Sequence, residues 1–156
     1  GAQGTLLVTT GTRYEWPGVT VFFKAGEYDL AEYGALQVTV SNTAERPLTV
    51  SLSVKNHGQK GASPGGQVWL RPGGQGVITA SLRPSPWVLD KPLELVGMRG
   101  FPSSLEGGTF NVGKAAELHL FIANPDRPAR FAVTRIAASR QPLNMLKTDT
   151  FLPSLI

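Results

Sequence analysis

Apolar and polar residues alternate along the middle of the chain. The alternation is clearest in residues 36–41, where leucine and valine alternate with glutamine, threonine and serine, and it recurs in residues 50–55 and 78–83. Successive side chains of a strand point to opposite faces, so a period of two with one apolar face indicates a half-buried strand of an antiparallel sheet. The pattern therefore predicts three such strands.

Further strands are expected where short apolar or β-branched runs stand between Gly and Pro turn signals. They cover residues 5–10, 19–24, 67–70, 93–96, 116–123 and 130–137. Residues 19–24 and 118–122 are apolar at both parities, which is typical of central strands covered on both faces. The one helical candidate is short, at residues 143–147. The pattern as a whole predicts an all-β sandwich of two antiparallel sheets.

The composition agrees with one globular domain that has many turns. The chain has 156 residues with 18 glycines and 12 prolines, which favours many short strands over helices. It has no cysteine, which excludes disulfide bonds and thiolate metal sites. The net charge of +4 comes from scattered basic residues, without the basic run and interleaved aromatics of a nucleic-acid interface. No apolar run approaches the roughly 20 residues that span a bilayer. We therefore expect neither nucleic acid nor membrane as a partner.

The pattern changes after the last expected strand. From about residue 139 onward, apolar residues follow one another without strand periodicity. We therefore expect a jelly-roll β-sandwich domain at residues 1–138 and a C-terminal tail or linker at residues 139–156. A tail would wrap back onto the sandwich, whereas a linker would lead to a following domain, and the sequence leaves both open.

No motif predicts catalysis in this chain. Residues 61–65 match the pattern G-x-S-x-G, but a polar loop precedes them and a proline follows the serine, so the strand and helix of a nucleophile elbow are missing. Acidic residues gather near the start of the chain, at Glu15, Glu27, Asp29 and Glu32. They are interpreted as solvated loop acids, as a catalytic carboxylate pair or as ligands of Ca²⁺, which prefers oxygen donors. Glu27 and Asp29 are the candidate ligands of a structural Ca²⁺.

Aromatic residues are the best-placed candidates for molecular recognition. Tyr14, Trp16, Trp69 and Trp87 stand close to Pro or Gly turn signals. Rings of Trp and Tyr stack on the apolar C–H faces of sugars, while their polar edges tolerate water. Packing in the core or in a loop is the alternative for each of them. Trp16 and Trp87 each adjoin a proline and are the two most expected to be exposed.

Six short segments carry a family resemblance. They are, in chain order, residues 36–42, 50–56, 70–73, 97–102, 120–125 and 131–136. The first three look like early strands and a turn of galactose-binding-like jelly rolls, and the others resemble a loop and the last strands of the N-terminal domain of agarase-like glycoside hydrolases. The similarity spans about residues 19–138. In that family the jelly roll precedes a (β/α)8 barrel that supplies the catalytic glutamates. The resemblance thus implies an antiparallel two-sheet jelly-roll β-sandwich without catalytic acids of its own.

The same resemblance implies a function. It suggests a secreted, non-catalytic carbohydrate-binding module that binds an agarose- or porphyran-type galactan by aromatic stacking and hydrogen bonds. Its partners would be the polysaccharide and a catalytic domain in the same polypeptide. Two alternatives stay open. One is a structural accessory domain that packs on a catalytic barrel without binding sugar, and the other is a protein-binding β-sandwich of a surface or periplasmic protein.

Overall fold

Eight strands and one short 3₁₀ helix make up the part of the chain that the structure describes. The structure is a computed structural model, and it describes residues 4–59, 63–82 and 110–140. The strands are β1 Leu6–Thr10, β2 Gly18–Phe22, β3 Ala35–Asn42, β4 Leu48–Asn56, β5 Gly65–Leu70, β6 Gln75–Ser81, β7 Ala115–Phe121 and β8 Ala129–Ser139. The helix η2, Val112–Lys114, stands directly before β7. No helix in these ranges is long and apolar enough to cross a membrane.

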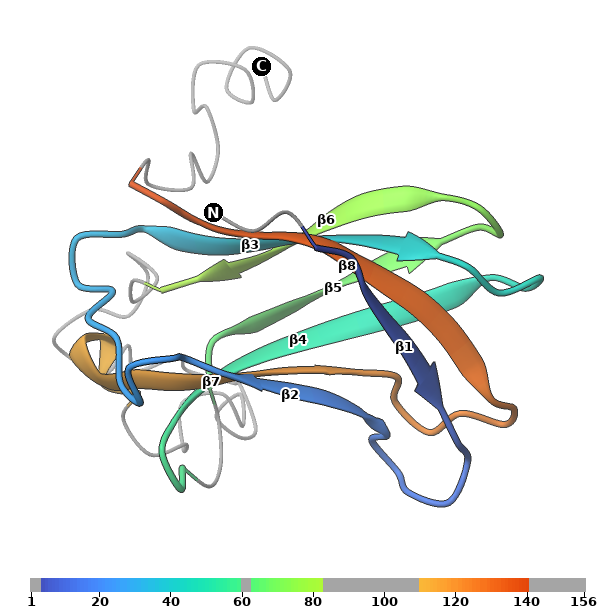
Figure 1. Cartoon of the computed structure of the whole chain (residues 1–156), viewed down its shortest axis with the longest axis horizontal. Helices are drawn as coiled ribbons and strands as arrows, with labels where there is room; N and C mark the ends of the chain where they lie inside the picture. Colours follow the sequence, from blue (N-terminus) through green and yellow to red (C-terminus); the bar gives the residue numbers. More distant parts are fainter. Residues whose placement is uncertain (1–3, 60–62, 83–109, 141–156) are drawn as a thin grey trace, which may run out of the picture.

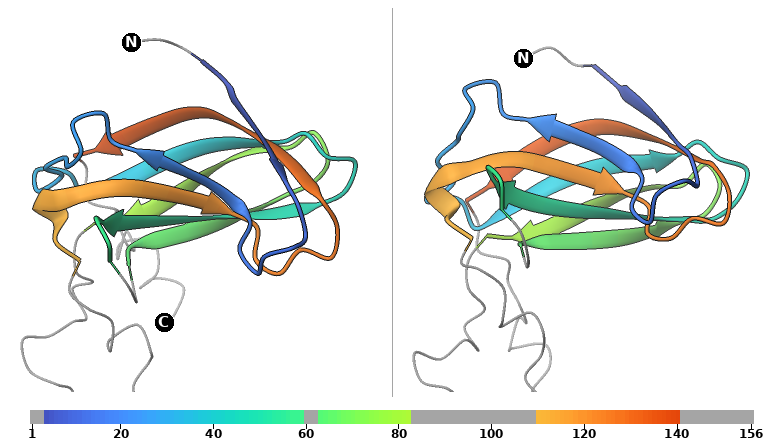
Figure 2. Two further views of the ribbon diagram at one scale, coloured as in Figure 1. Left: turned by 60° about the horizontal axis from the view of Figure 1, so that its bottom comes forward. Right: turned by 90° about the horizontal axis from the view of Figure 1, so that it is seen from below.

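The strands form two four-stranded sheets that face each other (Figures 1 and 2). One sheet has the order β1-β8-β3-β6 and the other β2-β7-β4-β5, and all neighbouring strands are antiparallel. The pairing is nested, because β1 pairs with β8, β2 with β7, β3 with β6 and β4 with β5. Nested pairing across two antiparallel sheets is the arrangement of a jelly roll. The predicted all-β sandwich is therefore confirmed.

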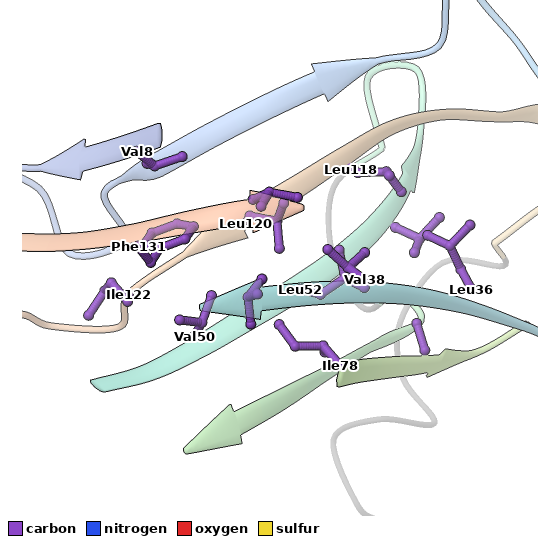
Figure 3. Close-up of a cluster of buried hydrophobic side chains, with 14 of the residues drawn as sticks. Val8, Leu36, Val38, Val50, Leu52, Ile78, Leu118, Leu120, Ile122 and Phe131 are labelled. Carbon is purple, nitrogen blue, oxygen red and sulfur yellow. The ribbon is translucent and has the colours of Figure 1, made fainter. Parts of the chain in front are cut away.

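The core lies between the two sheets and consists of the apolar residues that alternate along each strand (Figure 3). In β3 the alternating residues Leu36, Val38 and Val40 are buried, as the sequence pattern predicted, while the residues between them lie on the outer face. Among the described residues, the largest fully buried side chain is that of Phe131 in β8. Burial of apolar surface at about 25 cal/mol per Å² is the main force that holds the sheets together. The sequence period of two is thus the direct cause of the two-layer fold.

The position of β2 differs from the sequence-based expectation. Residues 19–24 were expected in a central strand covered on both faces, but β2 is an edge strand of its sheet. Its Val19 and Val21 pack against the core, whereas Phe22 is 66% exposed on the opposite face. This strand is therefore apolar on both faces for two different reasons. Its valines face the core, whereas Phe22 is an uncovered aromatic on the outer face. The expected strand at 93–96 and the helical segment at 143–147 lie outside the described residues.

Four connections meet at one end of the sandwich, which we call the four-loop end. They are residues 11–17, 43–47, 71–74 and 122–128. Asn42, the last residue of β3, joins two of them because its side-chain Nδ2 donates to the carbonyl oxygens of Arg46 (2.7 Å) and Leu70 (3.1 Å). Its Oδ1 accepts from the Ala44 N–H at 2.9 Å. A buried amide whose donor and acceptor are both satisfied fixes the loops around it.

Candidate functional site

The outer face of the β2-β7-β4-β5 sheet carries an unusual set of aromatic and hydrogen-bonding side chains. This face is seen in the right-hand view of Figure 2. Residues that pair across antiparallel strands lie side by side on one face, so the register sorts the outer residues into rows. The rows are Gly18–Phe121–Ser51–Gln67, Thr20–His119–Ser53–Gly65 and Phe22–Glu117–Lys55. The first two rows thus combine aromatic rings with uncharged polar groups, and the third adds the charged Glu117 and Lys55.

Backbone hydrogen bonds extend the β2–β7 register into the loop before β2. The Ile122 N–H donates to the Pro17 carbonyl (3.1 Å), and the Asn124 N–H donates to the Glu15 carbonyl (2.6 Å). Both bonds continue the β2–β7 register in which Gly18 pairs with Phe121. Trp16 therefore lies opposite Ala123. Ala123 comes two residues after Phe121, so its side chain points to the same outer face. The pair of Trp16 and Ala123 therefore belongs to that face.

A fourth row, which we call the tryptophan row, follows from this register. Thr49 of β4 pairs with Trp69 of β5. The β4–β7 ladder ends at the pair Ser51–Phe121, and the same register continued by two residues would bring Thr49 opposite Ala123. The row consequently reads Trp16–Ala123–Thr49–Trp69. Its two indole side chains are exposed, at 59% for Trp16 and 65% for Trp69. Two small residues separate two large exposed rings.

A pocket of about 220 Å³ opens at the middle of the tryptophan row. Both central residues of the row, Ala123 and Thr49, line it. The polar residues of its wall are Arg46, Thr49, Ser51, Gln67, Asn124 and Asp126. This volume is below the roughly 300–1,000 Å³ of pockets that enclose drug-sized ligands. The pocket has room for one ring with its substituents, held by hydroxyl, amide and carboxylate groups.

Arg46 supports the pocket wall. Its Nη1 lies 3.3 Å from Asp126 Oδ1, and its Nη2 donates to the carbonyl oxygens of Arg127 (2.8 Å) and Pro128 (3.4 Å). Among the residues that line the pocket it is the one cation, and these contacts occupy both of its terminal nitrogens. The charge of Arg46 is therefore paired within the wall, which offers hydroxyl, amide and carboxylate groups as hydrogen-bonding partners.

His119 lies near the centre of the same face. Its ring stacks on that of Phe121, with 4.8 Å between the centroids. Burial lowers the pKa of His119 below its ordinary value, and the positive charge of Lys55 lowers this pKa further, against an opposing contribution from Glu117. The imidazole is consequently neutral near pH 7 and offers one donor and one acceptor nitrogen.

The structure places the predicted sugar-binding residues as follows. Trp16 and Trp69 come together in the tryptophan row, although they belong to different parts of the sequence. Tyr14 lies in the same loop as Trp16, is 68% exposed, and has the Arg13 guanidinium 5.8 Å from its ring centroid. Trp87 lies outside the described residues.

Sequence reasoning did not single out the polar residues of the face. Thr49, Ser51 and Gln67 stand at the polar positions of alternating strands, and such positions occur on every half-exposed strand. The signal that distinguishes them is the pairing of β4 with β5 and β7. Strand pairing is not encoded in the alternation itself.

The expected Ca²⁺ ligands form no larger cluster in the described ranges. No group of three or more His, Cys, Asp or Glu side chains that could hold a metal ion occurs there. Asp29 Oδ1 accepts the Ala31 N–H at 2.9 Å, which closes a local turn. Calcium takes six to eight oxygen ligands, so a site at Glu27 and Asp29 would need backbone carbonyls or water for the remainder. Structural Ca²⁺ at these residues stays a prediction.

Comparison with known proteins places the chain by its fold. No protein-family model matches it, and no curated protein matches it in sequence. Among solved structures, it is similar to that of PfGH50B, with a TM-score of 0.60 and 13% identity over 87% of this chain and 20% of that one. It is also similar to the crystal structure of an agarase, AgWH50C, with a TM-score of 0.56 and 13% identity over 86% of this chain and 20% of that one.

The expected resemblance to agarase-like proteins is thereby confirmed at the level of the fold. The chain spans about one fifth of the length of either neighbour. At 13% identity, the likeness establishes the jelly roll and leaves the function to be argued from the site.

Proposed function

We propose that this domain is a non-catalytic carbohydrate-binding module that binds a polysaccharide on the outer face of the β2-β7-β4-β5 sheet. The observation that carries the proposal is the tryptophan row, in which exposed Trp16 and Trp69 stand on either side of a polar pocket. Exposed indoles offer flat apolar surface for sugar C–H faces. The pocket supplies donors and acceptors for ring hydroxyls.

The charge of the pocket is compatible with neutral and with sulfated galactans. Asp126 pairs with Arg46 at 3.3 Å and with Arg127 at 3.7 Å, so its carboxylate is neutralised and the three groups together carry one positive charge. A sulfate ester at the pocket would therefore meet no uncompensated negative charge. Agarose-type and porphyran-type chains, both implied by the family resemblance, remain candidate ligands of this site.

The fold similarity covers about one fifth of each of the two neighbouring structures, one of them an agarase. This similarity supports the proposal that the module belongs to a larger protein. The module would be part of a secreted protein and would work beside a catalytic domain in the same polypeptide. A weak sugar contact is useful in that setting, because linkage to a second binding site converts it into an intramolecular event with high effective concentration.

Affinity electrophoresis tests the proposal directly. The chain is run in native gels that contain agarose, a sulfated galactan or an unrelated glucan, beside a gel without polysaccharide. We expect retardation in at least one of the two galactan gels and none with the glucan. The Trp69→Ala variant should migrate as if no polysaccharide were present. A folded chain that is retarded by no polysaccharide would contradict the proposal and favour the structural accessory role.

A further inference from the structure

We propose that the bound glycan crosses the strands along the tryptophan row, with its outer rings on Trp16 and Trp69 and its two inner rings over the central residues and the pocket. This inference rests on the proposed function and adds the direction, length and end points of the binding site. The competing path runs parallel to the strands, from the tryptophan row toward Phe22 at the other end of the sheet. The two paths use different residues, so they can be distinguished.

The dimensions of the row match an extended glycan. Neighbouring strands lie about 4.8 Å apart, so the three strand spacings between Trp16 and Trp69 span about 14 Å at the backbone. One pyranose ring in an extended chain advances by nearly the same length as one strand spacing. Three spacings separate four positions, so the row seats about four consecutive rings, with a large aromatic side chain at each end.

The shape of the surface along the tryptophan row also suits this path. Its central residues, Ala123 and Thr49, are small and line the pocket, whereas its end residues are exposed indoles. A chain that lies across the row can rest its outer rings on the indoles and extend hydroxyls of its inner rings into the pocket. Gln67 and Asn124 stand in the pocket wall as partners for these hydroxyls.

The path along the strands lacks comparable surface. The outer residues of the central strand β7 are Phe121, His119 and Glu117, all of them half-buried. The next exposed aromatic is Phe22, which is three rows from Trp16, or about 20 Å along β2. Its row contains the charged Glu117 and Lys55, and charged side chains do not provide a stacking surface for sugars.

Calorimetric titration with a length series of neutral agarose oligosaccharides tests the direction. Wild-type affinity should rise with length until the ligand spans the row, at about four rings, and then level off. Trp16→Ala and Trp69→Ala should each lower the affinity for a hexasaccharide about tenfold and should remove most of the rise with length. Phe22→Ala is the matched control, since it removes an equally exposed aromatic from the same face, and its affinity should equal that of the wild type.

Each outcome of this experiment decides between the models. If Phe22→Ala weakens binding as much as the tryptophan variants, or affinity keeps rising well beyond four rings, the glycan does not cross along the row. If only one tryptophan variant loses affinity, the row is not the binding path. In these cases the proposed function survives and the direction is wrong. A wild-type chain that binds no oligosaccharide and no polymer overturns the proposed function and the direction together. Thermal unfolding of each variant verifies that the loss does not come from misfolding.

Discussion

Asn42 provides the sharpest test of how the four-loop end is held together. Its side chain is 1% exposed and makes three hydrogen bonds, two to the carbonyls of Arg46 and Leu70 and one from the Ala44 N–H. Asn42→Ala removes all three and leaves the partner groups without their protein contact. Arg46 lines the pocket, and Leu70 follows Trp69 directly. The substitution thus acts on stability and on the shape of the site.

The expected cost follows from the burial of this network. Each intramolecular hydrogen bond contributes about 1 kcal/mol net, and a buried group left unsatisfied adds to the loss. We expect Asn42→Ala to lower the free energy of unfolding by about 3–4 kcal/mol. For a domain of this size, that corresponds to a fall in Tm of roughly 6–16 °C.

Asn56 is the matched control, because its side chain also makes three hydrogen bonds. It donates to the carbonyls of Asn111 and Lys114, both at 2.7 Å, and accepts the Asn111 N–H at 2.8 Å, but these bonds are exposed. Water can replace partners at an exposed site. Asn56→Ala should therefore cost only about 1 kcal/mol. Urea unfolding followed by circular dichroism measures both variants.

Equal losses for the two variants would refute the reasoning, because they would mean that burial of the network does not matter. A loss below about 1 kcal/mol for Asn42→Ala would refute it as well, since water would then be replacing the buried amide. A fall in the unfolding slope m instead of the midpoint would indicate a change in the compactness of the unfolded or native state.

Three further predictions concern the core, the edge strand and the histidine. Phe131→Ala should lower the free energy of unfolding by about 3–5 kcal/mol in urea titrations, whereas Phe22→Ala should cost less than about 1 kcal/mol, because only the first ring is buried. Gly18→Ala should destabilise the chain by about 1–3 kcal/mol and weaken its retardation in agarose gels, because a Cβ at this position would overlap the Leu120 carbonyl. Gly11→Ala is the control. A Cβ at that position has open space, so the variant should be neutral in both assays. The folded pKa of His119 is lowered, so the unfolded chain binds more protons and the free energy of unfolding should rise with pH across the interval between that folded pKa and about 6.5. His119→Gln should flatten this part of the stability profile, and an unchanged slope would exclude the histidine as its origin.

The two-layer fold was predictable because its cause is local. The alternating residues 36–41, 50–55 and 78–81 lie in β3, β4 and β6, whose apolar residues form much of the core. In these strands, residues that face the opposite sheet are apolar and most residues that face outward are polar. This difference is visible in the sequence as a period of two. The edge position of β2 was not predictable in this way. Whether Phe22 is covered depends on which strand lies beside β2, and that is a property of the pairing.

The candidate site was predictable only in part for the same reason. Trp16 and Trp69 could be selected because exposed aromatics near turns are suited to sugar binding. Their alignment in one row could not be read from the sequence, because it depends on the register of β2 with β7 and of β4 with β5. A slip of one residue in either ladder would turn the corresponding side chain to the other face.

The two ends of the tryptophan row are held by different means, and this has a functional consequence. Trp69 lies within a regular ladder in which six residue pairs join β4 to β5. Trp16 lies in the connection 11–17, which crosses from the sheet of β1 to the sheet of β2 and is tied to the end of β7 by two backbone hydrogen bonds. Changes in that connection can therefore move one end of the site while the pocket and Trp69 stay in place. In the proposed function, this connection would set the length of glycan that is preferred, and the sheet would set the affinity for the inner rings.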